Sequence, residues 1–174
     1  GRGAELGVVI RSGAALERAR RIDTVVFDKT GTLTRGTPVV TDVMTVNGHI
    51  ERDLLPIIAG AEQLSEHPIA HAIVRRCTAQ GLTPRAANAV ETTVGAGVAG
   101  RVDDHQVIVG GARMMDAHGI AVPRKLENAA ALFAAHGQSV SFAAIDGQCV
   151  AVIALQDEVR TEAAATVRSL QERG

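Results

Sequence analysis

Residues 24–34 read Thr-Val-Val-Phe-Asp-Lys-Thr-Gly-Thr-Leu-Thr. The apolar, β-branched run Thr24 to Phe27 predicts a buried strand, and the residues after it, rich in glycine and threonine, predict a loop. An aspartate at the carboxyl end of such a strand, here Asp28, lies where α/β sheets bind their ligands. The loop offers backbone N–H groups and hydroxyls to phosphate oxygens. Asp28 is therefore a candidate nucleophile that forms an acyl phosphate, with Mg²⁺ neutralising the developing charge.

The seven residues from Asp28 to Thr34 resemble the phosphorylation motif of P-type ATPases, which belong to the haloacid dehalogenase superfamily. The resemblance implies that Asp28 accepts the γ-phosphoryl group of ATP and that Lys29 and Thr30 complete the catalytic loop. It also implies that Mg²⁺ binds the Asp28 carboxylate and the Thr30 backbone carbonyl. Soluble phosphatases of the superfamily carry a second aspartate at the position of Thr30. A hydroxyl does not titrate near neutral pH, so we expect a longer-lived phosphoenzyme here.

A second motif, Ser65-Glu66-His67-Pro68, comes at the predicted start of a helix. It resembles a signature of heavy-metal P-type ATPases. The resemblance implies that His67 packs against the adenine of ATP, that Glu62 faces the adenine edge and that Glu66 belongs to the same nucleotide site. His71 follows His67 by four residues, a spacing that suits a metal pair. Because no third ligand accompanies them, we interpret His71 as a solvent-facing side chain.

Residues 95–100 match the pattern G-x-G-x-x-G. A dinucleotide fingerprint requires a helix directly afterwards, whereas the following residues predict a turn between strands, so we reject that interpretation. The glycines then indicate either a close approach of the backbone to a ligand or a β-bulge. The resemblance places Gly95 and Gly97 along the nucleotide phosphates and ribose, and Gly110 completes the set. Gly111 stands where the family commonly has asparagine, which removes one hydrogen bond, worth about 1 kcal/mol.

The rest of the chain predicts alternating helices and strands. Helices are expected over 14–21, 51–64, 68–80, 112–118, 123–136 and 158–173, and strands over 38–46, 90–109 (two or three), 139–145 and 148–155. Asn47-Gly48 and Asp146-Gly147 are hairpin signals. The predicted fold is α+β, an antiparallel sheet flanked by two helical hairpins over 36–154. This block is inserted into an incomplete α/β haloacid-dehalogenase-like phosphorylation domain, represented by 1–35 and 155–174.

Composition excludes several classes of protein. The 174 residues carry 18 basic and 19 acidic side chains, a net charge of −1, and three aromatic residues, so neither a basic nucleic-acid surface nor a stacking platform is expected. Cys77 and Cys149 belong to no metal or disulfide pattern and are predicted to be buried thiols. No apolar run approaches the ~20 residues of a membrane span. The first residues do not resemble a signal peptide, and the chain is interpreted as a piece of something longer.

The leading hypothesis is the ATP-binding part of a P-type ATPase that exports heavy-metal cations, with ATP and Mg²⁺ as cofactors. Residues 12–17 and 65–70 favour copper over zinc or cadmium. The resemblance implies the remaining phosphorylation, actuator and transmembrane domains as partners, and a place at the cytoplasmic face of a bacterial plasma membrane. Two alternatives stay open: a soluble phosphatase of the superfamily with a cap domain, and a non-catalytic nucleotide-binding module.

Overall fold

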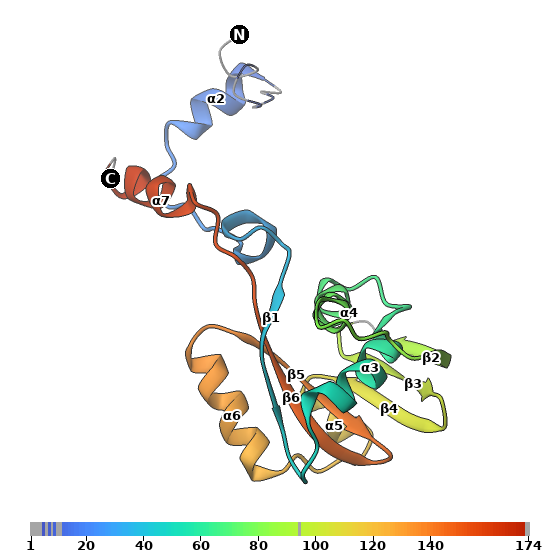
Figure 1. The fold of residues 1–174 in the computed structure, drawn as a ribbon. Helices are drawn as coiled ribbons and strands as arrows, with labels where there is room; N and C mark the ends of the chain where they lie inside the picture. Colours follow the sequence, from blue (N-terminus) through green and yellow to red (C-terminus); the bar gives the residue numbers. More distant parts are fainter. Residues whose placement is uncertain (1–4, 6, 8, 10–11, 94, 173–174) are drawn as a thin grey trace.

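The computed structural model describes residues 5, 7, 9, 12–93 and 95–172, and its centre is a six-stranded antiparallel sheet (Figure 1). The strand order is β1-β6-β5-β4-β3-β2. The strands are β1 (Val39–Thr45), β2 (Ala87–Thr93), β3 (Gly97–Val102), β4 (His105–Gly110), β5 (Ser139–Ile145) and β6 (Gln148–Gln156). Every pairing within this sheet is antiparallel, which confirms the predicted fold class.

Helices α3 (Glu51–Glu62) and α4 (Pro68–Ala79) cover one face of the sheet. Proline is tolerated at the first position of α4 because that N–H has no partner inside the helix. Gly81 follows the helix with φ of +71°, the left-handed conformation that ends helices at glycine. Ile58 and Ile73 are fully buried here against sheet residues that include Val109.

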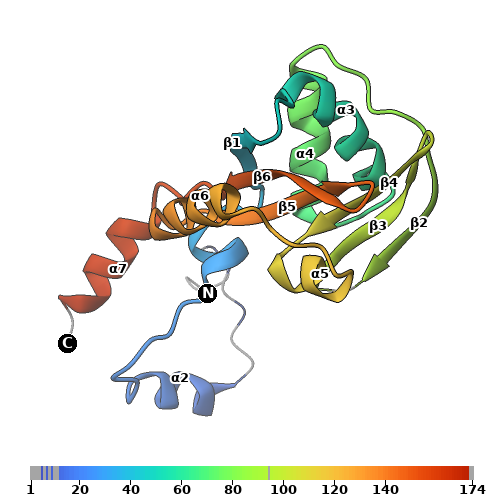
Figure 2. The ribbon, with the colours of Figure 1, turned by 90° about the horizontal axis from the view of Figure 1, so that it is seen from below.

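Helices α5 (Ala112–Ala117) and α6 (Arg124–Ala135) cover the opposite face (Figures 1 and 2). Side chains alternate across a strand, so Ile108 packs on this side while its neighbours in β4 pack on the other. Met115 and Leu126 are fully buried against strand residues of β5 and β6. Each of the two cysteines lies in one of these cores as a free thiol, as predicted.

Three elements lie beyond the end of the sheet where β1 begins and β6 ends (Figure 1). They are α2 (Gly13–Ala19), the π-helical turn η1 (Lys29–Leu33) and α7 (Ala163–Gln171). No residue of α2 is buried, and α7 buries only Ala163. No helix in the described part of the chain is both long and apolar enough to span a bilayer.

The strand predicted over Thr24 to Phe27 is wrong for this chain. These residues are irregular, and the side chain of Val26 is 90% exposed. A strand needs a neighbour to pair with its backbone N–H and C=O groups, and no described strand lies beside this run.

Two further predictions differ from the structure in detail. Asn47-Gly48 forms a turn with positive φ at both residues, but it leads into α3 rather than into a second strand. The partner of β1 is the distant β6. The last helix begins at Ala163 instead of residue 158, because residues 157–160 are held by the loop after Asp28.

Candidate functional site

A cavity of about 460 Å³ lies where the amino-terminal end of α4 faces the turn between β2 and β3. The ends of α3, β3 and β4 and the start of β5 close it. Its lining contains all six predicted nucleotide residues, namely Glu62, Glu66, His67, Gly95, Gly97 and Gly110. Residues as far apart in the sequence as Glu62 and Gly110 therefore line the same cavity. None of the described residues that line this cavity is a lysine or an arginine.

Close backbone packing explains the glycines of one cavity wall. Gly97 has a φ of +152°, and a Cβ there would lie 2.1 Å from the Val109 carbonyl oxygen. A Cβ on Gly110 would lie 2.4 Å from the Ala96 carbonyl oxygen. The Gly111 N–H donates to that same Ala96 oxygen at 3.3 Å. Close packing of the backbone between β3 and β4 therefore accounts for glycine at these two positions, and the predicted close approach of the backbone to a ligand stays a prediction.

Glu62, the last residue of α3, is only 5% exposed. Its carboxyl group makes no hydrogen bond or ion pair with any described residue. Among the described residues, no fully buried side-chain oxygen lacks a hydrogen-bond partner. The carboxyl oxygens are therefore accessible from the cavity that Glu62 lines. Burial raises the pKa of this group from 4.5 to about 7, because low-dielectric surroundings disfavour the charged form.

His67 is the N-cap of α4. Its ring Nδ1 accepts a hydrogen bond from the Ile69 backbone N–H at 3.2 Å, and the His67 backbone N–H donates to the Ser65 hydroxyl at 3.3 Å. An accepting Nδ1 leaves the proton of the neutral ring on Nε2. Glu66 lies at the rim with a fully exposed side chain, 3.9 Å from His71 Nε2. The predicted solvent-facing position of His71 agrees with its half-exposed side chain.

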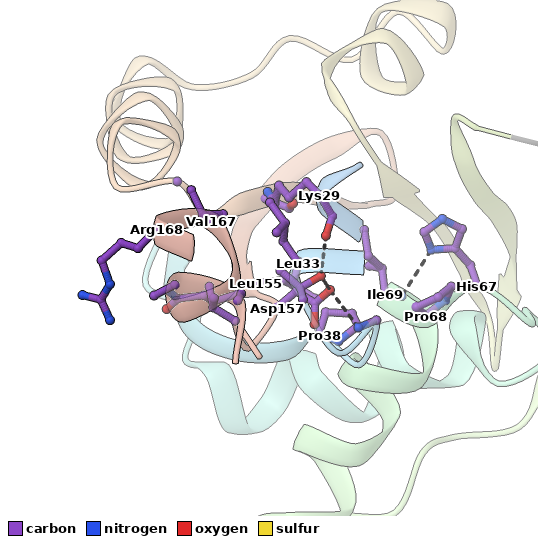
Figure 3. A pocket seen from close by; sticks show the side chains of 18 residues that line it. Lys29, Leu33, Pro38, His67, Pro68, Ile69, Leu155, Asp157, Val167 and Arg168 are labelled. Atoms are coloured by element: carbon purple, nitrogen blue, oxygen red, sulfur yellow. Dashed lines mark hydrogen bonds between the residues drawn. The ribbon is translucent and has the colours of Figure 1, made fainter. Parts of the chain in front are cut away.

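A second cavity, of about 780 Å³, lies between η1, the start of α4 and α7 (Figure 3). Lys29 and Leu33 line it from η1, and Val167 lines it from α7. His67 and Ile69 line both cavities. The first turn of α4 therefore forms part of the wall of both cavities, and Figure 3 shows His67 among the side chains that line the second one.

Asp28 directly precedes η1 in an extended conformation, with an exposed side chain that makes no capping hydrogen bond. It lines neither cavity, whereas its neighbour Lys29 does. Thr30 lies within η1. The structure thus brings the predicted nucleotide residues together. Asp28, the predicted phosphate acceptor, does not line the larger cavity, but the next residue in the chain does.

A polar junction that sequence analysis missed holds the loop after Asp28 to the end of β6. Asp157 Oδ2 accepts from the Thr34 hydroxyl at 2.5 Å and from the Gly36 N–H at 3.1 Å, and Oδ1 accepts from the Thr37 N–H at 3.1 Å. Thr34 is only 2% exposed, and its hydroxyl also accepts from the Gly31 N–H at 3.2 Å. The only sequence signal was an acidic residue at the end of a strand.

Backbone bonds reinforce this junction on either side of Thr34. The Arg35 N–H donates to the Glu158 carbonyl and the Arg160 N–H donates to the Leu33 carbonyl, each at 2.9 Å. The Arg160 guanidinium donates through Nε to the Thr34 carbonyl at 3.1 Å. The two places where the chain enters and leaves the sheet therefore form one short antiparallel contact.

Replacing Thr34 by valine is expected to destabilise this junction by about 2 kcal/mol, because Asp157 loses one donor and Gly31 loses its acceptor. Amide hydrogen exchange should accelerate at Gly36, while sheet amides stay protected. Thr37→Val is the matched control, since only the backbone of Thr37 contacts Asp157. Equal exchange in the two variants would contradict the role given to the Thr34 hydroxyl.

The haloacid dehalogenase-like hydrolase family model matches residues 22–174, which is most of the chain. The chain belongs to this family. The matched region begins before Asp28 and includes both cavities and the junction at Asp157.

This haloacid dehalogenase-like chain is homologous to copper-transporting ATPases over its full length. It is 43% identical over all its residues to Copper-transporting ATPase 2 of Rhizobium meliloti, and covers 21% of that protein. It is 40% identical to a copper-exporting P-type ATPase of Legionella pneumophila, and covers 23% of that protein. The chain thus spans about a fifth of the length of these curated relatives.

Solved structures give the same relationship. A zinc-transporting PIB-type ATPase in the E2.Pi state matches with a TM-score of 0.67 and 34% identity, over 95% of this chain and 26% of that one. The catalytic CPx-ATPase domain CopB-B matches with a TM-score of 0.69 and 28% identity, over 95% of this chain and 54% of that one. The haloacid dehalogenase-like chain therefore shares its fold with the catalytic parts of heavy-metal P-type ATPases.

Proposed function

We propose that this chain is the ATP-binding part of a P-type ATPase that exports heavy-metal cations, with copper as the favoured cargo. The observation that carries the proposal is that His67 lines both cavities. One holds every predicted nucleotide residue, and the other reaches Lys29 beside Asp28. An ATP molecule with its base in the smaller cavity extends its phosphates past His67 towards this loop. The names of the most similar curated relatives support copper.

The proposal includes a division of the chain into parts. Residues 36–154 are the nucleotide-binding domain, and residues 1–35 and 155–174 belong to the phosphorylation domain. The location of both cores within the sheet and its four helices supports this division. So does the match to the N-domain of HMA6, a copper-transporting P-type ATPase, which covers 69% of this chain and 99% of that domain at a TM-score of 0.59.

Mg²⁺ belongs to the same proposal. The donors available at the loop are the Asp28 carboxylate and the Thr30 backbone carbonyl, oxygen ligands of the hard type that Mg²⁺ prefers. No group of three or more His, Cys, Asp or Glu side chains that could hold a metal ion occurs among the described residues, so these residues supply only part of a set of Mg²⁺ ligands. Bound Mg²⁺ would neutralise charge on the phosphoryl group. In the whole pump, the remaining phosphorylation, actuator and transmembrane domains are the partners, and this chain lies at the cytoplasmic face of the plasma membrane.

Two substitutions at His67 test the nucleotide site. His67→Gln and His67→Asn should each weaken ATP binding by about 1–3 kcal/mol, since both remove a base-stacking ring. Only His67→Gln should also destabilise α4, by about 1 kcal/mol, because asparagine is a strong N-cap residue and glutamine is not. Titration calorimetry measures the first effect and thermal unfolding the second.

The pair separates a contact with ATP from a merely structural role. If His67 acted only as a helix cap, His67→Asn would bind ATP as the unchanged chain does. Unchanged affinity in both variants would overturn the proposed position of the base.

A further inference from the structure

Ser141, near the start of β5, carries a buried hydroxyl that the described part of the chain leaves without a partner. The residue is only 4% exposed, and its hydroxyl makes no hydrogen bond with any described residue. No fully buried side-chain oxygen among the described residues lacks a partner, so the Ser141 oxygen keeps some accessible surface. Because Ser141 lines the smaller cavity, this surface faces the cavity.

The pleat of β5 directs Ser141 towards α3 and α4. Side chains alternate across a strand, and Ala143 packs in the core beneath these two helices, whereas Phe142 packs in the core on the other side. Ser141 therefore lies on the same face of the sheet as Val98 and Val109, which also line the cavity. It is a polar position on the sheet-side floor of this space.

The neighbouring strand leaves open space beside this position. β4 pairs with β5 as far as Gly110, which lies opposite Phe142. The strand ends there, so the register brings the next residue, Gly111, to the position opposite Ser141. A Cβ built on Gly111 meets no atom within 4 Å, and both residues line the cavity. A ligand therefore has room next to the end of β4.

The surroundings of the Ser141 hydroxyl favour an uncharged, flat ligand group. Val98, Val109 and Ala70 are at most 2% exposed and line the same cavity, which has no lysine or arginine among its described lining residues. A phosphate group there would lose its hydration without an opposing charge. The ring of a base instead buries apolar surface and presents hydrogen-bonding atoms at its edge.

We propose that the Ser141 hydroxyl forms a hydrogen bond with an edge atom of the adenine ring and is a further nucleotide-binding group of this chain. The inference rests on the proposed ATP-binding function, and it adds a contact from β5 to those predicted from the helices and the glycine turns. A hydroxyl donates to a ring nitrogen or accepts from the 6-amino group, so it complements either kind of edge atom. The contact positions the base on the sheet.

Ser141→Ala removes this hydroxyl and leaves the rest of the floor in place. We expect the variant to bind ATP about three- to tenfold more weakly, the effect of losing one hydrogen bond between uncharged groups. Thr92→Val is the matched control, because Thr92 lines the same cavity with an exposed side chain that water can serve. Its affinity should change by less than about twofold. Titration calorimetry measures both, and equal losses in the two variants would contradict the proposal.

Stability without nucleotide separates a ligand contact from a structural role. A buried hydroxyl that is bonded within the fold lowers stability when it is removed, whereas the Ser141 hydroxyl has no described partner to lose. Ser141→Ala should therefore unfold at the same urea concentration as the unchanged chain, or at a higher one. A clearly lower unfolding midpoint would assign the hydroxyl to the fold and overturn the inference.

ATP analogues test the base as the partner of the hydroxyl. Four analogues, which lack N1, N3, N7 or the 6-amino group, are titrated into the unchanged chain and into Ser141→Ala. The analogue without the partner atom should bind both proteins equally, while the other three keep the difference of about three- to tenfold. An undiminished difference with all four would overturn the inference, because no edge atom would then be the partner. If the unchanged chain binds no ATP, the proposed function fails instead.

Discussion

Replacing Gly97 by alanine is expected to destabilise the fold by about 3 kcal/mol or more and to distort the wall of the smaller cavity that Gly97 lines. The added Cβ would lie 2.1 Å from the Val109 carbonyl oxygen and 2.7 Å from the Gly110 Cα, and both contacts are backbone atoms of the paired strand β4. The φ of +152° adds a conformational penalty for any residue with a side chain. To avoid these contacts, β3 and β4 would have to move apart and break hydrogen bonds between two strands inside the six-stranded sheet.

Gly111→Ala is the matched control for this change. Gly111 lines the same cavity, but its φ is −71° and no atom lies within 4 Å of a Cβ built there. Urea unfolding should place the control within about 1 kcal/mol of the unchanged chain. Equal unfolding midpoints for the two variants would show that strand packing does not require glycine at position 97.

The sequence predicts local elements well where their signals are local. Pro68 and Gly81 mark both ends of α4, and Asp146-Gly147 correctly predicts the hairpin of β5 and β6. Asn47-Gly48 has the same local signal, yet it precedes a helix. The pairing of β1 with β6 joins residues more than a hundred positions apart, and no turn residue encodes such a partner.

Most of the candidate site could be found from motifs, whereas its supporting contacts could not. Glu62 and His67 were predicted through family resemblance, but the burial of Glu62 depends on the packing of α3 against α4, β2 and β3, and the capping role of His67 depends on where α4 begins. Asp157 has no motif of its own. Its function emerges only when its three donors, all from residues 34–37, are brought beside it by the fold.

Incubation of this chain with ATP and Mg²⁺ is expected to leave Asp28 without a stable acyl phosphate, even though ATP binds. Transfer of the phosphoryl group to the Asp28 carboxylate depends on the positioning of the reacting atoms and on charge neutralisation. The run before Asp28 is irregular and exposed, no described strand supports it, and the Asp28 side chain lines neither cavity. Lys29 is the one cation that the loop directs to the larger cavity.

A displacement of about 1 Å from attack geometry can lower the rate about 100-fold. We therefore expect Asp28 to be labelled at least about 100-fold more slowly than it would be in a complete phosphorylation site. The test is incubation with γ-labelled ATP and Mg²⁺, acid quench, and treatment with hydroxylamine, which cleaves acyl phosphates. Asp28→Asn gives the background, and calorimetry on the same sample establishes that ATP is bound. Stoichiometric, hydroxylamine-sensitive label that Asp28→Asn abolishes would mean that residues 28–34, held through Thr34 and Asp157, suffice to orient the nucleophile.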